Sequence, residues 1–195
     1  EMALKGCTAC YDLSFEFPTP SVEGMNAAAQ AYRDVGIRAV VAPMVADHSF
    51  YEAISGLMEM LPPALAKDVE RFRLAPHRTT LANIRRVLRG WKGDRDQVRP
   101  AVAPTIPHHC SDVFLAGCGK LAREFGVGLH SHVAESKVQV IAGLRRYGTT
   151  LAAHMDELGL VGPDFTVAHG VWLDDDDMRR LGDKGASVAH NPGSN

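Results

Sequence analysis

The chain is poor in cysteine, balanced in charge and without long hydrophobic runs. Four thiols in 195 residues are too few for a disulfide framework and indicate a reduced, cytoplasmic protein. A formal net charge of −2 gives no reason to expect nucleic acid or an anionic membrane as a partner. No apolar run approaches the roughly 20 residues that cross a bilayer, and no signal-peptide pattern opens the chain.

Three familiar motifs are also missing. There is no G-x-G-x-x-G and no P-loop, so nothing points to a nucleotide-binding doubly wound sheet. The cytidine-deaminase signature, H-x-E followed by P-C-x-x-C, is absent too. The spacing from His132 to Glu135 is H-x-x-E, and the C-x-x-C at Cys7 and Cys10 lies upstream in an apolar segment. We interpret these two thiols as packing within a buried strand rather than as a zinc or redox pair.

What the chain does have is an alternation of short apolar runs with helix-like segments, which is typical of β/α units and a parallel sheet. With 46% hydrophobic residues it can form one core and one domain, residues 1–195. Strands are predicted at 7–13, 37–45, 98–104, 127–132, 165–169 and 186–190. Helices are predicted at 21–36, 81–91, 111–125, 137–158 and 174–181, with a helix or turn at 48–60 and an irregular excursion at 62–78. Six strands fit either an open doubly wound sheet or part of a (β/α)8 barrel, which needs roughly 200–250 residues.

Four histidine-bearing segments carry the functional signal: PTIPHHCS (104–111), HSHVAES (130–136), VAHGVWL (167–173) and VAHNPGSN (188–195). The carboxyl ends of parallel strands share one face, so His132, His169 and His190 are expected at the same end of the sheet. Imidazole is the commonest metal ligand, and a carboxylate such as Glu135 can move protons. The alternative is that one histidine of 130–132 is a hydrogen-bonded core residue and Glu135 caps the next helix.

These segments together resemble the amidohydrolase superfamily, in the branch of chlorohydrolases and aminohydrolases that act on guanine, adenosine-like and triazine substrates. The resemblance rests on H-x-x-E-[TS] at 132–136, A-H-x-x-x-L at 168–173 and S-H-N-P-x-S-N at 189–195. It extends to G-x-T-x-x-x-D at 6–12 and G-I-R-A-V at 36–40. It implies a partial (β/α)8 TIM barrel, about strands two to seven. The first and last barrel strands, with their H-x-H pair and aspartate ligands, and an N-terminal β-sandwich are expected to be absent from the chain.

The resemblance also implies roles for the site residues. His132 is a ligand of one divalent metal, zinc or alternatively iron, and Glu135 moves a proton to the substrate ring. His169 either binds the metal or hydrogen-bonds the attacking hydroxide or the substrate. Thr105 stands where relatives often have a substrate-facing histidine, so that contact differs, or His108 or His109 replaces it; the two histidines could also be a surface pair without a role. His190 and Asn191 are expected to shape the substrate-side loop, with structure favoured over chemistry.

The implied activity is a metal-dependent hydrolase of C–N bonds in cyclic amino compounds, most simply a deaminase of a purine, pterin, triazine or related N-heterocycle. The alternatives are a cyclic-amide or chloro-substituent hydrolase of the same superfamily, or an inactive barrel that binds ligands. The partner is then a small N-heterocyclic molecule. Two open sheet edges favour a homo-oligomer and leave this chain, alone, a weak metal binder and poor catalyst.

Overall fold

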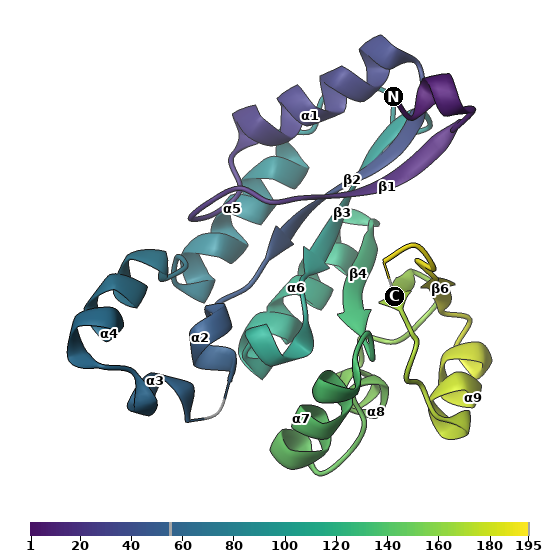
Figure 1. Ribbon diagram of the computed structural model, residues 1–195. Coiled ribbons are helices and arrows are strands. Elements are labelled where there is room, and N and C mark those ends of the chain that lie inside the picture. The colour runs from purple at the N-terminus through teal and green to yellow at the C-terminus, as the bar shows by residue number, and fades with distance from the viewer. Residues whose placement is uncertain (55, 195) are drawn as a thin grey trace.

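A computed structural model describes residues 1–54 and 56–194 and contains one six-stranded parallel sheet (Figure 1). The strands follow one another in space in the order β1-β2-β3-β4-β5-β6, and every neighbouring pair is parallel. They are β1 (Ala9–Ser14), β2 (Arg38–Val45), β3 (Val98–Pro104), β4 (Gly128–Val133), β5 (Phe165–His169) and β6 (Ser187–Ala189). This unreversed order is that of a barrel, whereas a doubly wound sheet reverses its strand order. The predicted partial barrel is confirmed.

Helices fill the connections between the strands. They are η1 (Ala3–Lys5), α1 (Val22–Val35), α2 (Phe50–Ala53), α3 (Leu57–Met60), α4 (Pro63–Val69), η2 (Glu70–Phe72), α5 (His77–Arg89), η3 (Pro107–His109), α6 (Asp112–Phe125), α7 (Lys137–Tyr147), α8 (Leu151–Glu157) and α9 (Asp175–Asp183). Within the described residues, no helix is both long and apolar enough to cross a bilayer.

Residues 62–78 differ from the sequence prediction, because they are largely helical rather than irregular. Pro63 occupies the first turn of α4, where a missing N–H costs nothing, so the Pro-Pro pair starts a helix as well as ending α3. Residues 48–60 form α2 and α3, apart from Ser55, which lies outside the described residues.

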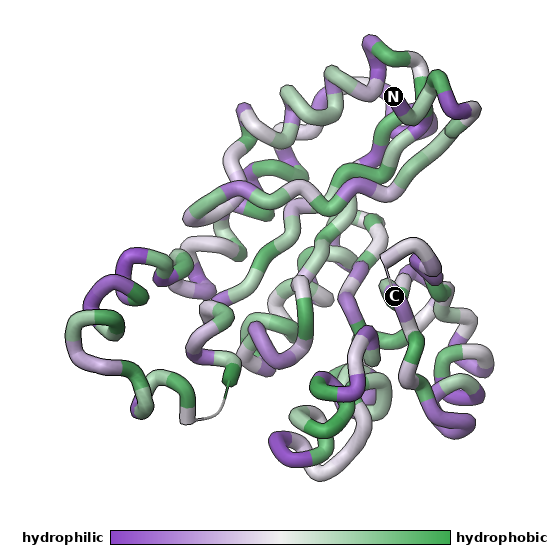
Figure 2. The backbone as a smooth tube through the Cα atoms, in the orientation of Figure 1, coloured by the Kyte–Doolittle hydropathy of each residue, from purple (hydrophilic) through white to green (hydrophobic). Residues whose placement is uncertain are grey.

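The outer face of the sheet carries the main core. The largest buried side chains there come from α5, α6, α8 and β5, and Figure 2 shows hydrophobic residues in green along the strands and at intervals along the helices. Phe114, Leu115, Met155 and Phe165 are each at most 1% exposed. Burying such side chains is worth roughly 1.5–3 kcal/mol apiece, so this layer fixes how the strands lie.

The inner face of the sheet is lined mainly by small side chains. Ala42, Ala101 and Ala103 form a separate buried cluster with side chains of β1 and β2. Because alanines occupy β2 and β3, Tyr11 of β1 reaches across them to His130 of β4, with 4.5 Å between ring centroids. Segments far apart in the sheet therefore meet beneath its carboxyl end.

Strand β1 is less buried than the sequence predicted. It begins at Ala9, so Cys7 lies before it and is exposed, and Cys10 is only half-buried. In the described chain β1 pairs only with β2, which leaves its other edge and part of its surface uncovered. The interpretation of Cys7 as strand packing was therefore wrong, although both thiols are free.

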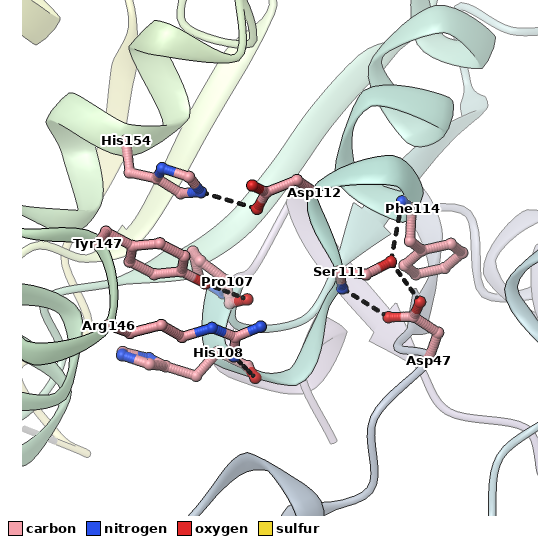
Figure 3. A network of polar contacts seen from close by, with 9 residues as sticks. All are labelled: Asp47, Pro107, His108, Ser111, Asp112, Phe114, Arg146, Tyr147 and His154. Atoms are coloured by element: carbon pink, nitrogen blue, oxygen red, sulfur yellow. Dashed lines mark hydrogen bonds and ion pairs between the residues drawn. The ribbon is translucent and has the colours of Figure 1, made fainter. Parts of the chain in front are cut away.

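The first turn of α6 is held by Asp47, which lies two residues after β2. The hydroxyl of Ser111 accepts the Phe114 N–H at 3.2 Å, and Asp47 accepts the Ser111 N–H at 2.8 Å and its hydroxyl at 2.6 Å (Figure 3). Ser111, the first residue of the segment predicted to be helical at 111–125, is thus the N-cap of α6. Through these two hydrogen bonds, Asp47 connects the segment after β2 to the loop after β3.

Replacing Ser111 by alanine is expected to lower the free energy of unfolding by about 1 kcal/mol, the usual cost of an N-cap. Urea denaturation followed by circular dichroism measures it. Ser111→Thr, which keeps the hydroxyl, should retain most of the stability. Equal losses in both variants would contradict the capping role.

Candidate functional site

The three histidines predicted to share one end of the sheet do so. His132 precedes the last residue of β4, His169 is the last residue of β5, and His190 directly follows β6. Val133 pairs with His169 and Ala168 with Ala189, so the three segments stand side by side at the carboxyl ends of their strands. This is the face on which barrels build their active sites.

His132 is held in one orientation by the backbone of the strand beside it. The Thr105 carbonyl accepts the His132 backbone N–H at 2.7 Å and lies 2.7 Å from its Nδ1. A carbonyl only accepts hydrogen bonds, so Nδ1 must carry the proton. In the neutral ring this tautomer leaves the lone pair on Nε2, which is the form a metal ligand requires.

His169 lies next to His132, with 5.5 Å between ring centroids and 29° between ring planes. Its side chain is buried, and its Nε2 lies 3.5 Å from Oε1 of Glu135. The described residues thus bring two imidazoles and one carboxylate together. They contain no group of three or more histidine, cysteine or acidic side chains arranged around a common metal position.

Glu135 is positioned by Gln139, one helical turn further on. Gln139 Nε2 donates to Glu135 Oε2 at 3.0 Å, and the Glu135 backbone N–H donates to Gln139 Oε1 at 3.1 Å. The N-cap of α7 is Ser136, so the alternative that Glu135 caps this helix is wrong. The glutamate side chain is about one third exposed (36%), so it can face both His169 and a molecule at the surface.

The backbone around these groups is strained. Ala134 (φ 54°) and His169 (φ 72°) adopt the left-handed conformation that favours glycine. Nearby bonds hold the turn: the Gly170 N–H donates to the Val133 carbonyl at 3.1 Å, and the Trp172 N–H donates to the Ala134 carbonyl at 2.9 Å. Strain of this kind concentrates at functional sites.

His130 is a core residue, as the alternative interpretation of the H-S-H pair proposed, but not a hydrogen-bonded one. It is 3% exposed, and neither ring nitrogen has a hydrogen-bond partner within the described part of the chain. Burial lowers its pKa to about 4, so the ring is neutral near pH 7. It lies on the same face as His132, 6.1 Å away between centroids, and contributes to the floor of the site rather than to its mouth.

The two histidines after β3 face different surroundings. His108 is 6% exposed and lies against α7, 6.1 Å from the Tyr147 ring, so the alternative of a surface pair is wrong in its location for this histidine. His109 is half-buried and lies 6.0 Å from the ring of Phe50 in α2. Burial lowers the pKa of His109, and the neighbouring His48 and His132 lower it further. The two histidines thus lie on different sides of the loop, His109 toward α2 and His108 toward α7.

Sequence reasoning missed a polar network that joins α6, α7 and α8 beside the site (Figure 3). His154 Nε2 donates to Asp112 at 2.9 Å, its ring stacks on Tyr147 at 3.7 Å, and the Tyr147 hydroxyl donates to the Pro107 carbonyl at 3.2 Å. The two hydrogen bonds join residues 40 and 42 positions apart in the sequence, and the ring stacking joins two neighbouring helices. No local sequence pattern could therefore reveal this network.

The segment after β6 is exposed. His190 Nδ1 lies 3.3 Å from the His169 carbonyl, which ties this segment to β5. The Asn191 carbonyl accepts the Ser194 N–H at 3.0 Å and forms a tight turn. Asn195, which ends the predicted motif, lies outside the described residues.

The buried His108 predicts a pH dependence of stability. Burial lowers its pKa from 6.5 to about 4, so the unfolded chain binds this proton more tightly than the folded one. The resulting stability is complete above pH 6.5 and falls as the pH drops toward 4, by about 2 kcal/mol between pH 7 and 4.5. Urea titrations across this range should show a shallower dependence in His108→Gln. If the free energy of unfolding of His108→Gln depends on pH as steeply as that of the wild type, His108 is not the group responsible.

The chain is similar to several known proteins. The family described as "Amidohydrolase family" matches residues 1–195. A 5'-deoxyadenosine deaminase from Methanopyrus kandleri is 33% identical over 99% of this chain and 38% of its own length. The zinc-bound structure of an adenosine deaminase from Xanthomonas campestris superposes with a TM-score of 0.75 at 23% identity, over 98% of this chain and 37% of that one.

The fold is shared more widely. An atrazine chlorohydrolase from Arthrobacter aurescens, complexed with zinc, gives a TM-score of 0.77 at 19% identity, over 96% of this chain and 39% of that one. The chain thus spans less than half the length of each of these proteins.

Proposed function

The chain belongs to the amidohydrolase family, and from that premise we propose that it forms the catalytic centre of a metal-dependent deaminase of N-heterocycles. The observation that carries the proposal is the arrangement of His132, His169 and Glu135. The Thr105 carbonyl bonds Nδ1 of His132 and so directs its Nε2 toward a possible ligand, and this ring lies beside the pair formed by His169 and Glu135. The matched deaminases support the reaction class, and their names supply purine nucleosides as the first substrates to test.

The donor set fits a divalent cation, zinc first and iron as the alternative. His132 would bind it through Nε2, and His169 through Nε2 or as a hydrogen-bonding group next to it. Such a cation, when bound, lowers the pKa of a water molecule and so supplies a nucleophile at neutral pH. The further ligands that zinc sites require would come from parts of the barrel other than residues 1–195.

The protein groups then divide the remaining work. Glu135, fixed by Gln139, would accept a proton from the attacking water and deliver it to the ring nitrogen of the substrate. His109, at the end of the short helix η3 that follows Thr105, would contact the substrate ring where Thr105 leaves a small side chain. We assign His108, His190 and Asn191 to the support of the loops that surround the substrate.

We further propose that residues 1–195 are the central strands of a longer barrel and that its open edges associate in a homo-oligomer. Free thiols at all four cysteines support a reducing compartment, the cytoplasm.

The test is ammonia release from adenosine, 5'-deoxyadenosine, guanine, a pterin and an aminotriazine by the enzyme that contains this chain, before and after chelation and zinc reloading. Ammonia released in a metal-dependent way is expected. Chloride release from a chlorotriazine without ammonia from any of these compounds would favour the chlorohydrolase alternative. Tight binding with no turnover would favour an inactive barrel.

A further inference from the structure

An open pocket of about 740 Å³ lies between α2 and α7, and we call it the α7 pocket. Glu52 and Ile54 line one side, Val138, Ile141 and Arg145 the other, and His108 also borders it. This volume is within the roughly 300–1,000 Å³ of small-molecule sites. The lining comes from segments that follow β2, β3 and β4, so the pocket opens at the carboxyl ends of the strands, as the candidate site does.

His109 connects the α7 pocket to the candidate site. It ends η3, the single turn that follows Thr105, whose carbonyl lies 2.7 Å from His132 Nδ1, and its own carbonyl accepts the N–H of His48 in the pocket wall at 3.0 Å. His109 is therefore close to both, and a molecule whose ring contacts His109 could extend a substituent into the pocket.

The walls of the pocket combine an apolar surface with positive charge. Val138 and Ile141, 75% and 43% exposed, face Ile54 across it and offer contact to a hydrocarbon chain. Arg145 and Arg146 border the same space. Leaving such apolar side chains exposed is costly unless a ligand or partner covers them.

The two guanidinium groups are available for an anion. Arg146 Nη1 donates to the His108 carbonyl at 2.8 Å, which holds that side chain in place (Figure 3). Neither Arg145 nor Arg146 forms an ion pair with an acidic side chain in the described residues. Glu52, the one acid in the lining, accepts the Ser49 N–H at 2.7 Å in the capping box of α2. The pocket therefore has an excess of unpaired positive charge.

We propose that the α7 pocket binds an anionic group, a carboxylate or a phosphate, at the end of a substituent on the heterocyclic substrate, with Arg145 as its specificity-determining contact. The apolar stem of the substituent lies against Ile141 and Val138. The inference rests on the proposed function only in taking the substrate to be an N-heterocycle.

The test compares three probes in the intact enzyme: adenosine, S-adenosylhomocysteine, which ends in a carboxylate beside an ammonium, and adenosine 5'-monophosphate, which ends in a phosphate. The last two are called the anionic probes after these end groups. Arg145→Gln should lower kcat/KM for one or both anionic probes by about 10-fold or more, the usual value of a charge-assisted hydrogen bond. The value for adenosine should stay within about twofold. Which anionic probe responds identifies carboxylate or phosphate as the group bound.

Two further variants sharpen the result. Ile141→Glu, which places a carboxylate on the apolar wall, should also select against adenosine 5'-monophosphate, whose phosphate has no positive charge beside it. Arg179→Gln removes an exposed arginine of α9 that pairs with Asp176 outside the pocket, and it should change no ratio between probes. Equal losses for all three probes in Arg145→Gln, or no loss for any, would overturn the proposal.

Direct binding separates this proposal from the proposed function. Calorimetric titration of the same probes requires no turnover. If the wild-type enzyme deaminates nothing but Arg145→Gln still weakens binding of an anionic probe about 10-fold, the function fails and the pocket assignment stands. If the enzyme is active but adenosine and the anionic probes bind both proteins with unchanged ratios, the pocket assignment fails alone.

Discussion

Glu135→Gln is expected to lower kcat by about 10²–10⁴-fold, the usual contribution of a general acid–base group. The amide keeps the shape of the side chain and can still accept a hydrogen bond from Gln139, but it cannot exchange a proton near neutral pH. Metal content and substrate affinity should therefore remain close to wild type. Steady-state ammonia release and elemental analysis of the same preparations measure both effects.

Glu157→Gln is the matched control, since Glu157 is exposed at the end of α8 and away from the site. It should retain the full rate. If Glu135→Gln keeps more than about a tenth of wild-type activity, the loss is smaller than proton transfer requires, and Glu135 has only a structural part beside His169.

His132→Ala should remove the metal. Loss of a hydrogen-bond partner behind a ligand already weakens metal binding roughly 10–100-fold, so loss of the ligand itself should exceed about 100-fold. Competition with a chromophoric chelator measures the affinity of the zinc-loaded enzyme. The reaction rate should fall with metal occupancy, and excess zinc should not restore it.

Thr105→Val is the control for this variant. It changes the side chain but keeps the backbone carbonyl that accepts the Nδ1 proton of His132, so zinc affinity should stay within a few-fold of wild type. Retention of wild-type zinc affinity in His132→Ala would show that the metal is held elsewhere.

The sequence allowed the fold to be predicted because its signals are local. Each strand is a short apolar run between helix caps, and the caps at Ser21, Ser111 and Ser136 occur where helices begin. The sequence predictions were wrong where the surroundings in the folded chain determine the burial or conformation of a residue. Cys7 is exposed because β1 forms an edge in the described chain, and Pro63 opens a helix because it falls in a first turn.

The features of the candidate site also fall into those that the sequence could predict and those that it could not. The shared end of His132, His169 and His190 follows from parallel topology and could be predicted. The orientation of His132 could not, because it depends on a backbone carbonyl that any residue at position 105 would provide. The separation of His108 from His109 depends on α7 and α2, which approach the loop from opposite sides of the pocket.

The left-handed backbone at Ala134 and His169 limits how this protein can evolve. Each such residue costs the fold of order 1–2 kcal/mol relative to an ordinary conformation. Selection for heat resistance alone would favour glycine or asparagine at both positions. At 134 that exchange leaves every side chain of the candidate site in place, whereas at 169 it removes the imidazole that faces Glu135. Histidine at 169 therefore carries a standing cost in folding free energy, and what it adds at that cost is an imidazole 3.5 Å from a carboxylate.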